Sequence, residues 1–175
     1  MATSLLASSA VVLVLVHLAS TLVGAGSITV AEWQYFRALM DGRIDDGERA
    51  HLVALFFSLR FALVLMVLTD IAIATVLFFL QGAHPFGLNA IYWFGLSLAV
   101  ILAGVSWLRF NARIPFWAGS AIAFSGWWYL AGMDMGYIPI SGYFSAMLGF
   151  IVSVGVISAL FGFVRFLVRL QANNA

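Results

Sequence analysis

The chain has 175 residues, of which 64% are hydrophobic and only 9% are charged, and its mean hydropathy is +1.08. Soluble domains contain about 45–50% apolar and about 25% charged residues, so this composition excludes a water-soluble globule and a disordered chain. The net charge of +1 excludes a nucleic-acid-binding module, because binding to a polyanion needs an excess of basic side chains. The absence of cysteine excludes disulfides and thiolate chemistry. The composition therefore predicts an all-α integral membrane protein that sits in a lipid bilayer.

Five stretches are apolar enough for membrane-spanning helices, which need about 20 mainly apolar residues. They cover residues 5–23, 52–80, 88–108, 114–133 and 143–167. Glycine, proline and polar residues separate these stretches, and Gly24 and Gly26 are expected to end the first of them. We therefore predict a single helical membrane domain, 1–175, that contains five transmembrane helices.

The connector between the first two spans, residues 27–49, is the only hydrophilic segment of the chain. Thr29 and Glu32 have the spacing of a capping box, which would start a new helix. Apolar residues then recur on one side of that helix and polar residues such as Glu32 on the other. This pattern predicts a short amphipathic helix in the membrane interface. Asp45 and Glu48 repeat the capping spacing and are expected to start the second membrane helix before the hydrocarbon region begins.

The arginines indicate an orientation. Seven of the eight basic residues fall on one side of a five-span arrangement. They are Arg37, Arg43, Arg49, Arg109, Arg113, Arg165 and Arg169. Because basic residues collect on the cytoplasmic side of a membrane, we predict an N-terminus outside and a C-terminus in the cytoplasm. The expected location is the bacterial inner membrane.

Small residues recur every four positions on two of the predicted spans. The third span carries Gly95, Ala99 and Ala103, and the fifth carries Ser145, Gly149 and Ser153. Small side chains at this spacing let helix backbones approach closely in lipid, where no hydrophobic force drives helices together. Packing within the bundle is the expected role, and contact within a homo-oligomer or a larger membrane complex is the alternative.

Polar residues inside the predicted spans are the candidate functional residues. They are His17, Ser20 and Thr21 in the first span and Arg60 and Asp70 in the second. A central Arg or Asp costs about 2.5–3.5 kcal/mol, so it normally faces a partner or a cavity. Counted from the expected span ends, His17 lies as deep as Arg60, so we predict a hydrogen-bonded cluster of His17, Ser20, Thr21 and Arg60. Asp70 lies nearer the outer interface, where a structural role and an ion or proton site are both open.

Haem and copper are the cofactor alternatives. A bis-histidine haem site would need a second imidazole at the depth of His17, and neither His51 nor His84 provides one. His84, Met133 and Met135 all lie on the predicted outer side, and thioether plus imidazole ligands suit Cu(I). The alternative for the two methionines is that they flank a turn. Neither pattern predicts a bound cofactor, and both remain alternatives.

The stretch from His17 to Leu52 resembles small polytopic bacterial membrane proteins of unassigned function. The shared pattern is a histidine in the first span, paired glycines, an acidic residue and an Asp-Gly-x-Ile-x-x-x-Glu connector. It falls on His17, Gly24, Gly26, Glu32, Asp41, Gly42, Ile44 and Glu48. The chain is more remotely similar to the copper-resistance D family of inner-membrane proteins, which implies a copper site. The likeness covers about a fifth of the chain.

Two classes of function follow from these features. One is a non-catalytic, transport-related protein that moves or senses a small solute or ion along His17, Arg60 and Asp70. The other is an accessory or assembly subunit that packs against a larger membrane complex; a haem- or copper-binding protein is a further alternative. The sequence contains no glycine-rich phosphate loop, zinc-type His-Glu pair or Ser-His-Asp arrangement, so enzyme activity is not expected.

Overall fold

A computed structural model of the chain describes every residue except 1, 42–44, 82–89, 112, 140 and 174–175. The described residues form five helices and no strand. The helices are α1 (Ala2–Asp41), α2 (Asp46–Gln81), α3 (Ala90–Phe110), α4 (Phe116–Asp134) and α5 (Tyr143–Asn173). Within the described residues, α1, α2, α3 and α5 are long and apolar enough to cross a membrane. The apolar stretches are Ser8–Ala38, Asp46–Leu80, Ala90–Arg109 and Tyr143–Val168.

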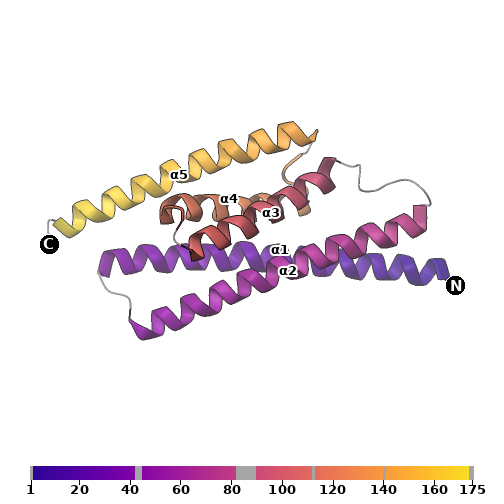
Figure 1. Cartoon of the computed structure of the whole chain (residues 1–175), viewed down its shortest axis with the longest axis horizontal. Coiled ribbons are helices and arrows are strands. Elements are labelled where there is room, and N and C mark those ends of the chain that lie inside the picture. Colours follow the sequence, from indigo (N-terminus) through magenta and orange to yellow (C-terminus); the bar gives the residue numbers. More distant parts are fainter. Residues whose placement is uncertain (1, 42–44, 82–89, 112, 140, 174–175) are drawn as a thin grey trace.

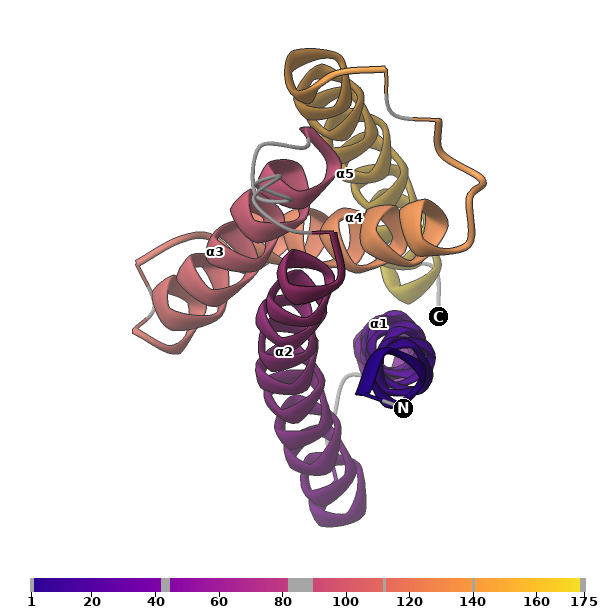
Figure 2. The ribbon, with the colours of Figure 1, turned by 90° about the vertical axis from the view of Figure 1, so that its right-hand side faces the viewer.

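The helices run back and forth along one long axis (Figure 1). Helix α1 begins at one end of the molecule, called here the N-terminal end, and α5 finishes at the opposite end, called here the C-terminal end. The most extensive contact joins α1 and α2, while α4 packs against α1, α3 and α5. Figure 2 shows α4 in the middle of the molecule, between the α3 and α5 helices and α1.

Helix α4 differs from the predicted fourth span, 114–133, in one respect. It covers nearly the same residues but is not among the described helices that are apolar enough to cross a membrane unaided. Many of its buried residues are small or polar: Gly119, Ser120, Ala121, Ser125, Gly126, Ala131 and Gly132. Because α4 is surrounded by other helices on three sides, protein atoms replace lipid around these residues.

The predicted break after the first span is wrong, because α1 continues without interruption to Asp41. Gly24 provides room for a neighbour: a Cβ atom there would overlap the indole ring of Trp127 in α4. Thr29 does not start a helix either, since its hydroxyl donates a hydrogen bond of 2.7 Å to the carbonyl of Ala25 within α1. The connector therefore contains no separate amphipathic helix in its first part; residues 27–41 extend α1.

The polar side of this extension differs from the prediction, because Glu32 is buried. Trp33 is 71% exposed and Val30 is 41% exposed, whereas Glu32 is only 4% exposed. An interfacial helix turns its polar side to water, but this part of α1 continues a helix that packs against other helices. The polar side chain of Glu32 then points into the bundle.

The predicted start of α2 is confirmed. The backbone N–H of Glu48 donates to Asp45 Oδ1 at 2.6 Å, and the backbone N–H of Asp45 donates to Glu48 Oε2 at 3.3 Å. This reciprocal pair is a capping box, which satisfies backbone donors at the first turn of a helix.

The small residues expected at helix contacts have different surroundings. A Cβ atom added at Gly149 would lie 2.6 Å from the Tyr129 hydroxyl, so α5 approaches α4 closely there. Ala99 is buried in the core. Gly95 has no atom within 4 Å of such a Cβ, so no close approach occurs at this glycine. The hydroxyls of Ser145 and Ser153 donate to carbonyls of their own chain segment, Gly142 and Gly149, and Ala103 lines a cavity.

Two contacts fix how α1 lies against α2. Ser27 and Ser58 share a hydrogen bond of 3.0 Å, and His17 Nδ1 lies 3.1 Å from the Thr69 hydroxyl oxygen. The residue number therefore falls along α1, from Ser27 to His17, as it rises along α2, from Ser58 to Thr69. The two helices form a regular antiparallel pair, and this register decides which polar groups meet.

Candidate functional site

His17 joins two carboxylates that come from different helices. Its Nδ1 atom lies 3.5 Å from Asp70 Oδ1 in α2, and its Nε2 atom lies 3.4 Å from Asp134 Oδ2 at the end of α4. The Thr69 hydroxyl is a further neighbour of Nδ1, at 3.1 Å. The side chains of His17, Asp70 and Asp134 are 14%, 24% and 19% exposed. We call His17, Thr69, Asp70 and Asp134 the histidine cluster.

The helices hold this cluster from three directions. His17 lies within α1, Thr69 and Asp70 are consecutive residues of α2, and Asp134 is the last residue of α4. Thr69 is fixed by its own helix, since its hydroxyl contacts the carbonyls of Leu65 and Met66 at 2.8 Å. The imidazole is therefore held between side chains whose backbone is helical.

The cluster can bind and pass on a proton. A neutral imidazole donates a hydrogen bond from one ring nitrogen and accepts at the other, whereas an imidazolium donates from both. Between two carboxylates, the protonated ring can donate to Asp70 and to Asp134 at once. The ring can take up a proton at Nε2 and release the proton that Nδ1 carries, which is the chemistry of a proton relay.

The predicted pairing of His17 with Arg60 is not what the structure shows. His17 faces Thr69 and Asp70, and Arg60 precedes Thr69 by nine residues in α2, or about 14 Å along the helix axis. The prediction placed the end of the first span at Gly26, but α1 continues to Asp41, so the depth of His17 was counted from the wrong residue. Arg60 instead lines a cavity between α2 and α3.

Ser20 and Thr21 were expected to accept hydrogen bonds from Arg60. Both are buried, and both hydroxyls donate within α1: Ser20 to the carbonyl of Val16 at 2.6 Å and Thr21 to that of Leu18 at 3.0 Å. These bonds satisfy the two hydroxyl protons and leave the oxygen lone pairs of the two side chains inside the bundle.

Further buried polar groups lie in α1 and α4 towards the C-terminal end. Ser120 and Ser125 in α4 and Glu32 in α1 are at most 5% exposed. The hydroxyl of Ser125 and the Oε2 atom of Glu32 are buried and make no hydrogen bond to another described group. Most buried polar atoms in proteins have such a bond, so these two atoms are exceptions.

Glu32 is the charged member of these buried polar groups and lies near the C-terminal end. Its carboxylate lies beside Ser120 and interacts electrostatically with Arg109 of α3 and Arg165 of α5. The Arg165 guanidinium also lies 5.4 Å from the ring centre of Tyr35. Two guanidinium groups and one carboxylate thus connect three helices, and we call Glu32, Arg109 and Arg165 the arginine cluster.

The soft-metal candidates are only partly described. His84 lies outside the described residues. Met133 packs against the hydrophobic core, and Met135 follows the end of α4 and is 37% exposed. Among the described residues, no group of three or more His, Cys, Asp and Glu side chains is arranged as metal ligands. Both ring nitrogens of His17 face oxygen atoms, so ligation of haem or copper by His17 would have to displace one of these neighbours.

Comparisons with family models, with curated proteins and with solved structures find no match to this chain. The chemistry of the described side chains is therefore the basis for assigning a function.

Several members of these clusters were not among the candidate site residues of the sequence: Thr69, Asp134, Glu32, Arg109 and Arg165. Asp134 falls between the predicted spans 114–133 and 143–167, and Glu32 was placed on the polar side of an interfacial helix. A usable signal existed for Asp134, because it and Asp70 were both expected near the outer ends of their helices. Glu32 gave no such signal, since its burial depends on α1 continuing through Gly24 and Gly26.

Proposed function

We propose that this chain is a transport-related membrane protein that binds and transfers protons, with His17 as the proton-binding group. The observation that carries the proposal is the position of the imidazole between Asp70 and Asp134. A histidine is the side chain whose protonation changes most readily near neutral pH. Ionisable residues inside membrane helices are costly and typically mark ion or proton pathways.

The remaining buried polar groups supply a route for the proton. Between the histidine cluster and Glu32, Thr21 is buried in α1, and Ser120, which lies beside Glu32, is buried in α4. His17 and Glu32 are separated by about 22 Å along α1, a large part of the roughly 30 Å thickness of the hydrocarbon region. The route has a titratable group at each end, His17 and Glu32.

The arrangement in the membrane is part of the proposal. The helices α1, α2, α3 and α5 cross the bilayer, and α4 crosses it inside the bundle, where other helices shield its small and polar residues from lipid. The C-terminal end, which carries Arg109 and Arg165, then faces the cytoplasm, and the N-terminal end faces outward, as the distribution of arginines predicts. The histidine cluster lies nearer the outer side and Glu32 nearer the cytoplasm.

Proton uptake by vesicles tests the proposal. The purified protein is reconstituted into liposomes that contain a pH-sensitive dye, and a potassium gradient with valinomycin drives protons inward. We expect wild-type protein to acidify the vesicles and His17→Gln to reduce the rate by about 10²-fold, as for loss of a proton-transferring group. Equal rates for empty, wild-type and His17→Gln vesicles would overturn it.

A second histidine variant serves as the control for effects that any loss of a histidine would have. His51→Gln removes an exposed histidine at the beginning of α2 and should leave proton uptake unchanged. Nitrogen-15 NMR of labelled histidine reports the protonation of His17 independently of transport. In Asp134→Asn the titration of the His17 signal should move, and an unchanged titration would show that Asp134 is not a partner of the imidazole.

A further inference from the structure

A cavity lies between the N-terminal half of α2 and the C-terminal half of α3, towards the C-terminal end of the molecule. Its volume is about 1060 Å³, at the upper end of the range of about 300–1,000 Å³ for small-molecule sites. Helices α2 and α3 touch each other little, and they diverge from the end of α2 towards its beginning (Figure 2). Trp127 of α4 and Ile28 of α1 also line the cavity, whereas no residue of the histidine cluster does.

Apolar side chains form most of the cavity wall. On α2 they include Val53, Phe56, Phe57, Leu63 and Val64, and on α3 they include Leu102, Ala103 and Trp107. Several of these side chains are also exposed: Phe57 is 72% exposed and Val64 is 57% exposed. The cavity therefore opens to the surface between the helices, and in a membrane this surface faces lipid chains.

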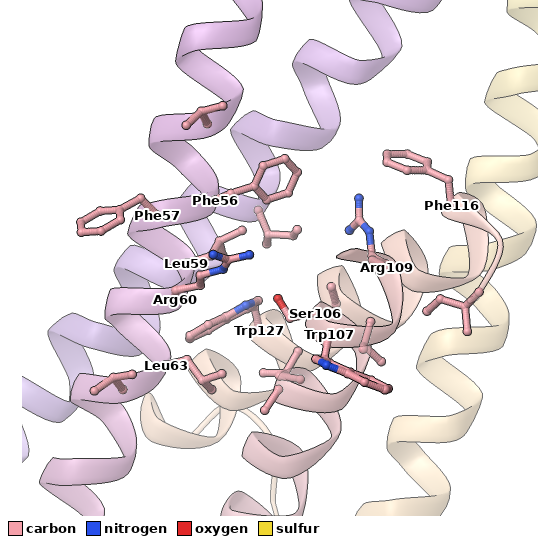
Figure 3. A pocket seen from close by; sticks show the side chains of 18 residues that line it. Phe56, Phe57, Leu59, Arg60, Leu63, Ser106, Trp107, Arg109, Phe116 and Trp127 are labelled. Carbon is pink, nitrogen blue, oxygen red and sulfur yellow. The ribbon is translucent and has the colours of Figure 1, made fainter. Parts of the chain in front are cut away.

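Two positive charges interrupt the apolar wall. Arg60 of α2 and Arg109 of α3 line opposite sides of the cavity, and the Ser106 hydroxyl lies between them (Figure 3). The described residues that line the cavity include no acidic side chain. The carboxylate nearest to Arg109 is that of Glu32, which also interacts with Arg165. The described lining of the cavity thus contains two guanidinium groups and no carboxylate.

We propose that this cavity binds a phospholipid with an anionic head group from the surrounding bilayer. The acyl chain lies against the apolar walls of α2 and α3, and the phosphate lies between Arg60 and Arg109. Arginine forms strong, charge-assisted hydrogen bonds with phosphate oxygens. Basic pockets between membrane helices are known to hold lipid head groups, because an apolar slot and a cationic site match both parts of the lipid.

Native mass spectrometry with two lipids tests the proposal. The protein is purified in detergent, stripped of lipid and titrated with phosphatidylglycerol or phosphatidylcholine that carry identical acyl chains. We expect one phosphatidylglycerol molecule to be retained in preference to phosphatidylcholine. Arg60→Gln should weaken phosphatidylglycerol binding about fivefold. Arg49→Gln, which removes an exposed arginine of the same helix outside the cavity, should have no effect.

A second variant tests the acyl-chain site without touching an arginine. Ala103→Phe fills the cavity and should abolish retention of both lipids, whereas Val100→Phe, at a position of α3 that does not line the cavity, should not. Neither change removes a charge from the arginine cluster. The result is therefore independent of the electrostatic role of Arg109 in folding.

Three outcomes would overturn the proposal. Equal retention of the two lipids would show that the arginines do not select a head group. A preference for phosphatidylglycerol that survives both Arg60→Gln and Ala103→Phe would place the lipid elsewhere on the protein. A lipid-free dimer that Ala103→Phe dissociates would show that a second copy of the chain occupies the cavity instead.

Discussion

Buried polar residues of α1 recur at intervals that place them on one side of the helix. His17, Thr21 and Glu32 are separated by four and eleven residues, and Gly24 and Ile28 occupy the positions between them. Residues at such intervals lie above one another on a helix. This side faces α2 and α4, so the polar groups meet partners from other helices instead of lipid.

The first residue-scale prediction concerns Glu32. In Glu32→Gln the guanidinium groups of Arg109 and Arg165 lose their shared carboxylate inside the protein. Because an unpaired buried charge is costly, we expect the free energy of unfolding in mixed micelles to fall by about 3–5 kcal/mol. The exposed Asp46→Asn should cost less than about 1 kcal/mol. A loss for Glu32→Gln as small as that of Asp46→Asn would show that the carboxylate does not neutralise the arginines.

A pair of glycines in α1 gives the second prediction. Gly24→Ala places a Cβ atom against the indole ring of Trp127, which is itself only 3% exposed. We expect a loss of about 1–3 kcal/mol in unfolding free energy. Gly26→Ala meets no atom within 4 Å and should stabilise α1 by about 0.5–1 kcal/mol, because alanine is the better helix former. Thermal unfolding in detergent measures both, and equal shifts would contradict the contact.

At the scale of the helices, the ends of α2 and α4 have different origins. The first turn of α2 is fixed by its own sequence, through the side chains of Asp45 and Glu48. The end of α4 is followed by Gly136, whose φ of 76° is readily adopted by glycine and rarely by other residues. That turn leaves Asp134 at the last position of the helix, where it reaches His17.

The cap of α2 can be tested by itself. Asp45→Ala removes the acceptor of the Glu48 N–H and should destabilise the start of α2 by about 1 kcal/mol. Amide hydrogen exchange in the first turn of α2 should become faster by about fivefold, while exchange near Asp70 should not change. Faster exchange along the entire helix would show that the cap supports more than the first turn.

For the whole molecule, α4 determines on which sides of the membrane the two ends lie. If α4 crosses the bilayer with the other four helices, α1 begins and α5 finishes on opposite sides, as their opposite ends in Figure 1 suggest. If α4 does not cross, the remaining four crossings return both ends to the same side.

Cysteine labelling decides between these arrangements. The chain has no cysteine, so Ala2→Cys and Asn173→Cys each introduce a single reactive thiol. In intact cells, a membrane-impermeant maleimide should label the cysteine at position 2 but not the one at position 173. Lysed cells serve as the control in which both are labelled. Labelling of both positions in intact cells would show four crossings and contradict the burial of α4 within the membrane.

The sequence by itself determined the helical content, the membrane class and the start of α2. These follow from properties of neighbouring residues: the apolar composition, the length of apolar stretches and the capping pair of Asp45 and Glu48. The break at Gly24 and Gly26 was predicted wrongly, because a glycine that ends a helix and a glycine that admits a tryptophan ring look the same in a sequence. Only the position of Trp127 distinguishes the two.

Only the tertiary structure decided which polar groups meet. His17 is 52 residues from Thr69 along the chain, and its two carboxylate partners come from helices α2 and α4. Their meeting depends on the register of α1 against both helices, and a shift of one turn would move a side chain by about 5.4 Å. Depth counted along one helix cannot supply that register, which is why His17 was predicted beside Arg60 and lies instead between Asp70 and Asp134.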